Sequence, residues 1–179
     1  GDVVASTAAD VDAAVTVATN AVGRWSQASV MERAAVLMRA ADLVEADVNA
    51  FASAESFDTG KPLRLARSMD VPRAIANLRF FAGMAEHSAF GMVRHGGGAD
   101  RGGSIDLALN YTVRKPIGVV GLVTPWNLPL YLLTWKLGPA LAMGNAVVAK
   151  PSELTPTTAT MLAEVMQRAG LPDGVFNAQ

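Results

Sequence analysis

The sequence contains no cysteine among its 179 residues. That absence excludes disulfide bonds, thiolate-bound metal sites and a cysteine nucleophile within the chain. Charged residues are also scarce, at 17%, and the net charge is only −1. The chain as a whole therefore has no electrostatic attraction for nucleic acid or for anionic lipid.

Long apolar runs are missing as well. No stretch is apolar and uninterrupted enough to span a bilayer, and no signal peptide is visible after Gly1. We therefore expect a cytoplasmic protein with no membrane or nucleic-acid partner. Hydrophobic residues still make up 51% of the chain, more than in an average soluble domain. Either the core is large, or apolar surface meets a partner or another part of the polypeptide.

Apolar residues at helical spacing predict three helical segments in the first half of the chain. They run over 7–27, from 29 to about 57, and over 63–88, with Pro72 expected to kink or divide the third. Ser29 and Glu32 have the spacing of a capping box at the start of the second segment. The turn residues at 58–62 should end that segment.

The middle of the chain changes character. Residues 91–104 include six glycines and few apolar positions, which predicts a loop, and they match no phosphate-binding pattern. From Ile105 apolar and polar residues alternate, which predicts a long half-buried strand over 105–114. Lys115 and Pro116 should end it.

Continuous apolar runs alternate with helical patterns after Pro116. The predicted elements are a strand at 117–123, a helix at about 128–143, a strand at 145–149, a helix at about 156–169 and a strand from 174. Thr155 should cap the second of these helices, with Pro156 in its first turn. Such a βαβαβ pattern implies a parallel sheet covered on both faces. Both chain ends read like parts of strands, so we expect a piece of something larger.

Polar residues follow the first two strands of this predicted sheet. Parallel strands end at one edge, where α/β proteins bind ligands. Asn127 is the N-cap of the following helix, an amide donor aimed at an oxyanion, or both, since the two roles are not exclusive. Lys150 and Glu153 are either a solvated pair or the ligands of vicinal ribose hydroxyls, since a carboxylate can accept two hydroxyl protons.

The aromatic residues near this edge also allow two interpretations. Trp126, Tyr131 and Trp135 either belong to the core or line an apolar substrate tunnel, and Leu128, Leu132 and Trp135 share a helix face by spacing. His87 and His95 have no third ligand to complete a metal set, so we expect no metal site.

These motifs resemble those of the NAD(P)-dependent aldehyde dehydrogenase superfamily. The resemblance is densest over 116–129, which contains Thr124-Pro-Trp-Asn127, over 135–153, which ends in Lys150-Pro-Ser-Glu153, and over 171–177. Segments 109–116 and 126–136 look most like its muconic-semialdehyde dehydrogenase branch.

The resemblance implies a role for each position that matches. Asn127 would be the oxyanion-hole amide, and Lys150 and Glu153 would hold the adenosine ribose of NAD, with Ser152 beside them. The cofactor cleft would be lined by Val123, Thr124, Pro125 and Trp126. The tunnel for a small-molecule aldehyde would be lined by Leu128, Leu132 and Trp135.

The resemblance also implies an architecture, a partial Rossmann-like α/β fold with N-terminal helices and a protruding β arm. Residues 1–90 and 116–179 would form an incomplete NAD-binding domain, and residues 91–115 part of an arm used in homo-oligomerisation. The catalytic domain with its cysteine would lie outside this chain. We expect the N-terminal portion of an enzyme that oxidises a semialdehyde-like substrate with NAD, inactive on its own. The alternative is a truncated, non-enzymatic nucleotide-binding or interaction module. The absent G-x-G-x-x-G fingerprint disfavours other nicotinamide dehydrogenases.

Overall fold

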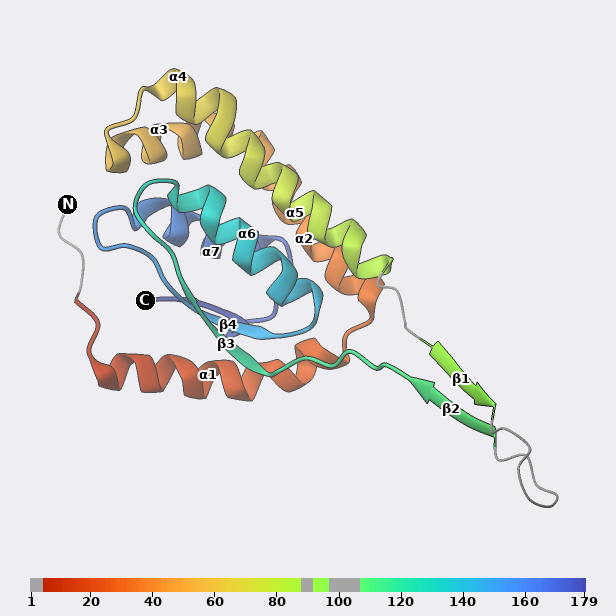
Figure 1. The fold of residues 1–179 in the computed structure, drawn as a ribbon. Helices are drawn as coiled ribbons and strands as arrows, with labels where there is room; N and C mark the ends of the chain where they lie inside the picture. Colours follow the sequence, from red (N-terminus) through yellow and green to blue (C-terminus); the bar gives the residue numbers. More distant parts are fainter. Residues whose placement is uncertain (1–4, 88–91, 97–106) are drawn as a thin grey trace, which may run out of the picture.

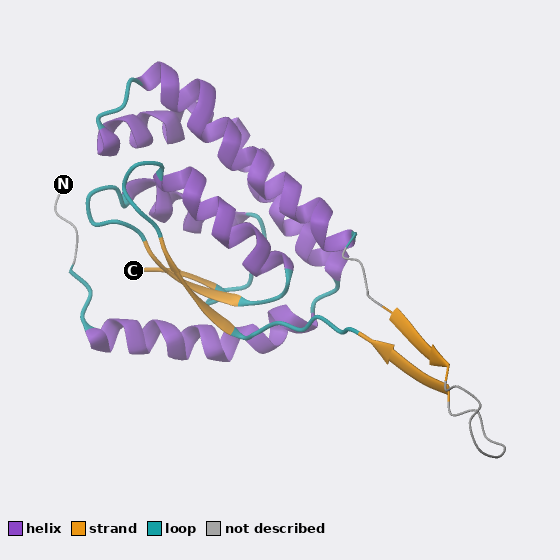
Figure 2. Cartoon of the chain, in the orientation of Figure 1, coloured by secondary structure: helices purple, strands orange, loops and turns teal. Residues whose placement is uncertain are grey.

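The computed structural model describes residues 5–87, 92–96 and 107–179 of the chain. A helical N-terminal half is followed by a two-stranded hairpin and then by alternating strands and helices (Figures 1 and 2). The elements are α1 (Ala8–Gln27), α2 (Val30–Ala46), α3 (Val48–Thr59), α4 (Leu63–Leu65), the π-helical η1 (Ala66–Asp70), α5 (Val71–Glu86), β1 (Met92–Gly96), β2 (Leu107–Tyr111), β3 (Val119–Val123), α6 (Pro129–Ala142), β4 (Ala146–Lys150), α7 (Thr157–Arg168) and β5 (Phe176–Ala178). Within the described ranges, no helix is both long and apolar enough to cross a membrane.

The second half of the chain forms a parallel sheet in the order β3-β4-β5. Helix α1 packs on one face of this sheet, and α6 and α7 cover the other (Figure 1). The prediction of a parallel sheet with helices on both faces is therefore confirmed. The central strand β4 is nearly continuous in buried apolar residues because both faces of the sheet are covered.

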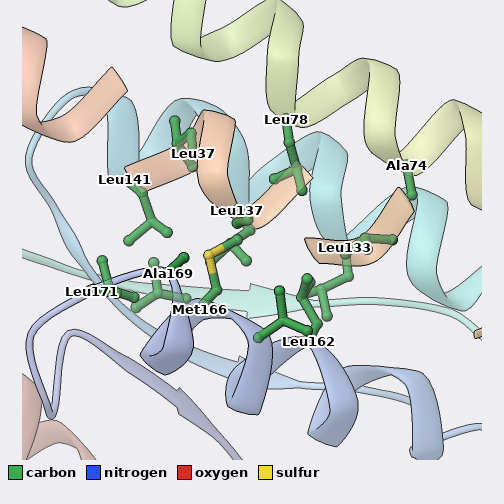
Figure 3. Close-up of a cluster of buried hydrophobic side chains, with 14 of the residues drawn as sticks. Leu37, Ala74, Leu78, Leu133, Leu137, Leu141, Leu162, Met166, Ala169 and Leu171 are labelled. Carbon is green, nitrogen blue, oxygen red and sulfur yellow. The ribbon is translucent and has the colours of Figure 1, made fainter. Parts of the chain in front are cut away.

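Helices α2, α3 and α5 form a further layer over α6 and α7 (Figure 1). Leucine side chains from α2, α5, α6 and α7 interlock between these layers (Figure 3). The fully buried members include Leu37, Leu78, Leu133, Leu137, Leu141, Leu162 and Met166. This apolar block is the main core, and it holds the helices that follow the strand ends.

Two glycines allow the close approaches that this packing needs. A Cβ at Gly138 of α6 would lie 2.7 Å from the Phe81 ring of α5, so only glycine fits between the two helices. Gly144 has φ +83 after the end of α6, as its place in the sequence predicts.

The last carbonyl groups of α6 accept hydrogen bonds from side chains elsewhere in the chain. Trp25 Nε1 donates to the Leu141 carbonyl, and Arg33 Nε donates to the Ala142 carbonyl.

The predicted helix from 29 to about 57 is wrong as a single element. The capping box of Ser29 and Glu32 is present, but α2 ends at Ala46 and α3 begins at Val48. Asp47 lies between them with φ −103 and ψ 24, outside the helical region. The apolar spacing continues across this break, so periodicity alone does not reveal it. The division before Pro72 is confirmed, because η1 precedes a helix with that proline in its first turn.

The hairpin corrects the prediction of a loop over 91–104. Residues 92–96 form β1, which pairs antiparallel with β2 from Met92↔Tyr111 to Gly96↔Leu107. The remainder of the predicted loop lies largely outside the described residues, as do the first four residues of the chain. Residues 107–111 confirm a strand within 105–114, separate from the parallel sheet. The hairpin projects away from the helices (Figure 1).

Candidate functional site at the strand ends

The two predicted polar segments meet at one edge of the parallel sheet. In the β3–β4 register Val123 pairs with Lys150, so both strands end at the same level. The N–H of Thr124 donates to the Lys150 carbonyl at 3.2 Å and carries the pairing one residue further. Segments 124–127 and 150–153 therefore leave the sheet side by side, as the sequence predicts.

A groove of about 630 Å³ runs along this edge. Its walls are mainly aliphatic, with charged and polar side chains at the rim. The lining residues are Ala5, Ser6, Val11, Gly121, Leu122, Val123, Val148, Lys150, Pro151, Ser152, Glu153, Pro156 and Gln179. A hollow of about 760 Å³ beside Trp25 and Arg39 is larger but contains none of the predicted site residues. The strand-end groove is thus the one that fits the sequence analysis.

Lys150 and Glu153 form an exposed ion pair at the groove. Lys150 Nζ lies 3.1 Å from Glu153 Oε2, and the two side chains are 59% and 75% exposed. The pKa of Glu153 is lowered, first by the backbone N–H of Glu153 itself and then by Lys150. Glu153 is therefore an ionised acceptor. Ser152 is mostly buried, and its Oγ accepts the N–H of Leu154 at 3.3 Å, which shapes the turn after β4.

Asn127 is not the N-cap of α6, so that interpretation is wrong. The cap is Leu128, with φ −146 and ψ 63, and it makes no side-chain capping hydrogen bond. Pro129 explains the shift, since a residue before proline is driven out of the helical region. Asn127 is exposed at the loop and its amide is not used as a cap.

A hydrogen bond from α6 holds the start of the loop that carries Asn127. Lys136 Nζ on α6 donates to the Val123 carbonyl at the end of β3, at 2.5 Å. Asn145 fixes the start of the same strand, because its Oδ1 accepts the N–H groups of Ile117 and Gly118 at 2.7 and 3.1 Å. Thr124 is buried in the loop, whereas Pro125 and Trp126 are exposed. Sequence spacing gave no signal for the roles of Lys136 and Asn145.

The aromatic residues divide between core and surface. Tyr131 is buried, but Trp126 and Trp135 are 57% and 52% exposed, so the core interpretation holds only for the tyrosine. The rings of Tyr131 and Trp135 meet edge to face, with centroids 5.3 Å apart. Leu132 is half-buried on α6, and Leu128 is half-buried at the cap position just before it.

Arg73 is a cation beside these rings that the sequence analysis missed. Its guanidinium carbon lies 3.8 Å from the centroid of the Tyr131 ring, a cation–π contact. Asn77, one turn further along α5, donates to the Tyr131 carbonyl and to Thr134 Oγ1 at 3.1 Å each. Arginine on an amphipathic helix ordinarily faces solvent, so only the packing of α5 on α6 reveals this position.

The predicted cap of α7 is also corrected. Thr155 does not cap this helix; Asp58 of α3 accepts the N–H and the hydroxyl of Thr157, both at 2.9 Å. The two residues are 99 positions apart, so no local pattern predicts the contact. A carboxylate at a helix N-terminus is favoured by the free N–H groups there. Helix α3 thereby holds the segment that follows Glu153.

Comparison with known proteins identifies the family. The model of the aldehyde dehydrogenase family matches residues 1–178. The chain belongs to the aldehyde dehydrogenase family. It is 50% identical over 170 residues to human 2-aminomuconic semialdehyde dehydrogenase, covering 94% of this chain and 33% of that protein. It is also 50% identical over 173 residues to 2-hydroxymuconic semialdehyde dehydrogenase of Pseudomonas sp. strain CF600, covering 94% and 34%.

Solved structures of this family have the same fold. An aldehyde dehydrogenase from Burkholderia cenocepacia superposes with a TM-score of 0.88 at 47% identity, over 98% of this chain and 34% of that one. PnpE in complex with nicotinamide adenine dinucleotide has a TM-score of 0.87 at 44% identity, over 97% and 34%. The chain spans about a third of the length of the curated relatives it matches. The incomplete, dehydrogenase-like α/β fold is thus confirmed.

Proposed function

We propose that the protein containing this chain oxidises a carboxylate-bearing semialdehyde to a carboxylic acid, with NAD as the oxidant. The observation that carries the proposal is that β3 and β4 end at one edge of the parallel sheet, which brings the loop of Asn127 beside the segment of Lys150 and Glu153, next to a groove. Because the chain covers a third of its relatives, the activity is assigned to the full polypeptide in which these residues occur.

The groove fits the adenosine half of NAD. Aliphatic walls formed by Leu122, Val123 and Val148 suit a flat, apolar ring, and Glu153 at the rim is an ionised acceptor for vicinal hydroxyls. Lys150 Nζ is the matching donor. We assign Thr124, Pro125, Trp126 and Ser152 to the surrounding cleft. NAD, when bound, supplies the nicotinamide that accepts a hydride from the substrate.

Asn127 is proposed to stabilise the oxygen of the substrate as it becomes negatively charged. Its side chain is exposed at the loop and free of a capping role, and its loop is held by Lys136. A donor fixed before the reaction lowers the barrier without reorganising during it. The sequence contains no cysteine, so the nucleophilic thiolate of the family reaction is not supplied by these 179 residues. We therefore expect no aldehyde turnover by the isolated chain.

The substrate class follows from Arg73 and the exposed aromatic wall. The relatives are named for muconic semialdehydes, which carry a carboxylate as well as an aldehyde. Arg73 is an exposed cation stacked on Tyr131, next to Trp135, and arginine pairs well with carboxylates. We propose that Leu128, Leu132 and Trp135 line the path of the substrate, with Arg73 near its acidic end.

We also propose the domain roles and an oligomer. Residues 1–90 and 116–179 would belong to the NAD-binding domain, and 91–115 to an arm that meets a second copy. The projecting β1–β2 hairpin supports this, as do the exposed apolar side chains of Tyr111, Val113 and Ile117 beside it. The proposed compartment is the cytoplasm, since the chain has no cysteine to form disulfides.

The proposal is tested with the full polypeptide, NAD and a carboxylate-bearing semialdehyde. We expect NADH to form in step with the acid, identified by mass spectrometry. If nucleotide binds but no aldehyde is oxidised, the enzymatic proposal fails and the nucleotide-binding module becomes the better account.

A further inference from the structure

Glu55 on α3 is a buried acidic residue that the proposed reaction does not use. Its side chain is 0% exposed, and neither carboxylate oxygen has a hydrogen-bond partner among the described residues. Within the same described part of the chain, the buried hydroxyls of Thr155 and Thr158 are also unpaired. Buried polar groups without partners are costly, so a native cluster of them calls for an explanation.

The surroundings of Glu55 link the starts of two helices. The Thr158 hydroxyl and the Leu130 N–H lie beside the carboxyl and favour its charged form, although neither reaches full hydrogen-bond geometry. Leu130 is in the first turn of α6, where backbone N–H groups have no partner within the helix. Thr158 is in the first turn of α7. Glu55 thus faces both helix starts from α3.

Asp58 supports the same arrangement from one turn further along α3. It lies three residues after Glu55, on the same side of the helix, and it accepts two hydrogen bonds from Thr157 at the start of α7. Helix α6 begins directly after the loop of Asn127, and α7 begins shortly after Glu153. Both proposed site segments are therefore anchored at the helices that α3 touches.

We infer that Glu55 is a positioning residue whose neutral carboxyl joins the first turns of α6 and α7 and fixes the two strand-end loops relative to each other. The neutral acid can accept the Leu130 N–H and donate its own O–H to Thr158, whereas the ionised form can only accept. The effect on cofactor binding rests on the proposed function; the effect on the two loops does not.

The charges around Glu55 are consistent with a neutral carboxyl. The pKa of Glu55 is raised to about 7, with burial as the largest cause; nearby Asp70 also acts to raise it, while Thr158, Leu130 and Lys61 act to lower it. Asp70 and Lys61 form an ion pair with each other. The unfolded chain releases this proton near 4.5, so stability should fall as pH rises from there to about 7.

The test compares Glu55→Gln, Glu55→Asp and Glu55→Leu in the full polypeptide, with Glu164→Gln as a control on the exposed face of α7. Glutamine keeps the shape, an acceptor and a donor, so hydrogen exchange in segments 124–131 and 151–158 should match the wild type. Aspartate and leucine should raise exchange in both segments together. They should also raise the KM for NAD by roughly tenfold to 10²-fold, the scale of a small misplacement of a site.

The wild type supplies a test that no folding defect can obscure. Its exchange in the two segments, corrected for intrinsic rates, should rise as pH passes through about 7, and Glu55→Gln should abolish this rise. An unchanged pH profile in Glu55→Gln, or glutamine behaving like leucine, would overturn the inference. If the wild type shows the exchange pattern but binds no NAD, the positioning role stands and the proposed function fails.

Discussion

The side chains between α5, α6 and α7 are almost all buried (Figure 3), whereas most of those at the ends of β3 and β4 are exposed. The first region holds leucines without access to solvent. The second has Lys150 and Glu153 exposed at a groove, and Trp126 and Asn127 exposed on the adjoining loop. The two regions share helices α6 and α7, because each helix starts at the edge and continues into the core.

This difference separates the residues that stabilise the fold, in the core, from those proposed to contact ligands, at the edge of the sheet. Exposed polar side chains at the edge contribute little to folding, since an exposed ion pair is weak and screened by salt. Their loops are held instead by side chains of neighbouring helices, such as Lys136 of α6, which donates to the Val123 carbonyl, and Asp58 of α3, which accepts from Thr157. Changes in the core should therefore alter stability without altering ligand preference, and changes at the edge should do the reverse.

The largest expected effect is the loss of folding stability caused by a substitution in the core. Leu162 on α7 is fully buried among the leucines of Figure 3. Leu162→Ala should destabilise the fold by about 2–5 kcal/mol, since it removes buried methyl groups and leaves a cavity. Urea unfolding measures this, and the dissociation constant for NAD, measured below the unfolding transition, should stay unchanged. A specific loss of NAD affinity in a folded variant would break the comparison.

The next largest effect is the loss of catalytic rate caused by a substitution at the edge of the sheet. In the full polypeptide, Asn127→Ala should lower kcat by roughly 10²–10³, as expected when one oxyanion donor is removed. Its unfolding free energy should change by less than about 0.5 kcal/mol, because the side chain is exposed and does not cap α6. Near-full kcat, with chemistry shown to be rate-limiting, would refute the oxyanion role.

A smaller, substrate-dependent effect is expected at Arg73. Arg73→Gln should lower kcat/KM for a carboxylate-bearing semialdehyde by roughly tenfold to 10²-fold, the range for one hydrogen bond to a charged group. A neutral aldehyde of the same length should be affected much less. Arg79→Gln on the same helix is the matched control, since Arg79 pairs with Asp42 and Glu45. Equal losses for both aldehydes would show that Arg73 only supports Tyr131.

The sequence predicts the edge better than the layer behind it. Strands β3 and β4 and helices α6 and α7 follow from apolar runs and their turn residues, and parallel pairing then brings 124–127 and 150–153 together. Contacts that depend on tertiary packing are not visible in such patterns. Asp58 capping α7, Arg73 stacking on Tyr131 and the burial of Glu55 all require α3 or α5 to be docked first.

Two errors have local physical causes. Pro129 displaces the cap of α6 from Asn127 to Leu128, because the residue before a proline is disfavoured in the helical conformation. The spacing of apolar residues does not reveal this constraint. The apolar stripe of residues 29–57 continues across Asp47, so the break between α2 and α3 leaves no gap in the pattern. The missed strand β1 is a third error with a different cause: glycine-rich composition predicts a loop over 91–104, and β1 forms through its pairing with β2.

The cofactor preference of the full polypeptide tests the central claim most directly. An ionised Glu153 beside the adenosine ribose should favour NAD, because a carboxylate repels the 2′-phosphate of NADP. The measurement is the ratio of kcat/KM for NAD to that for NADP, in the wild type, in Glu153→Ala and in the control Glu164→Ala. We expect a ratio well above one in the wild type and in the control, and a ratio reduced by about tenfold in Glu153→Ala, the size of a lost charge contact of roughly 1–2 kcal/mol. Equal kcat/KM for the two cofactors in the wild type, or a ratio that Glu153→Ala leaves unchanged, would contradict the assignment of the strand-end groove as the ribose site.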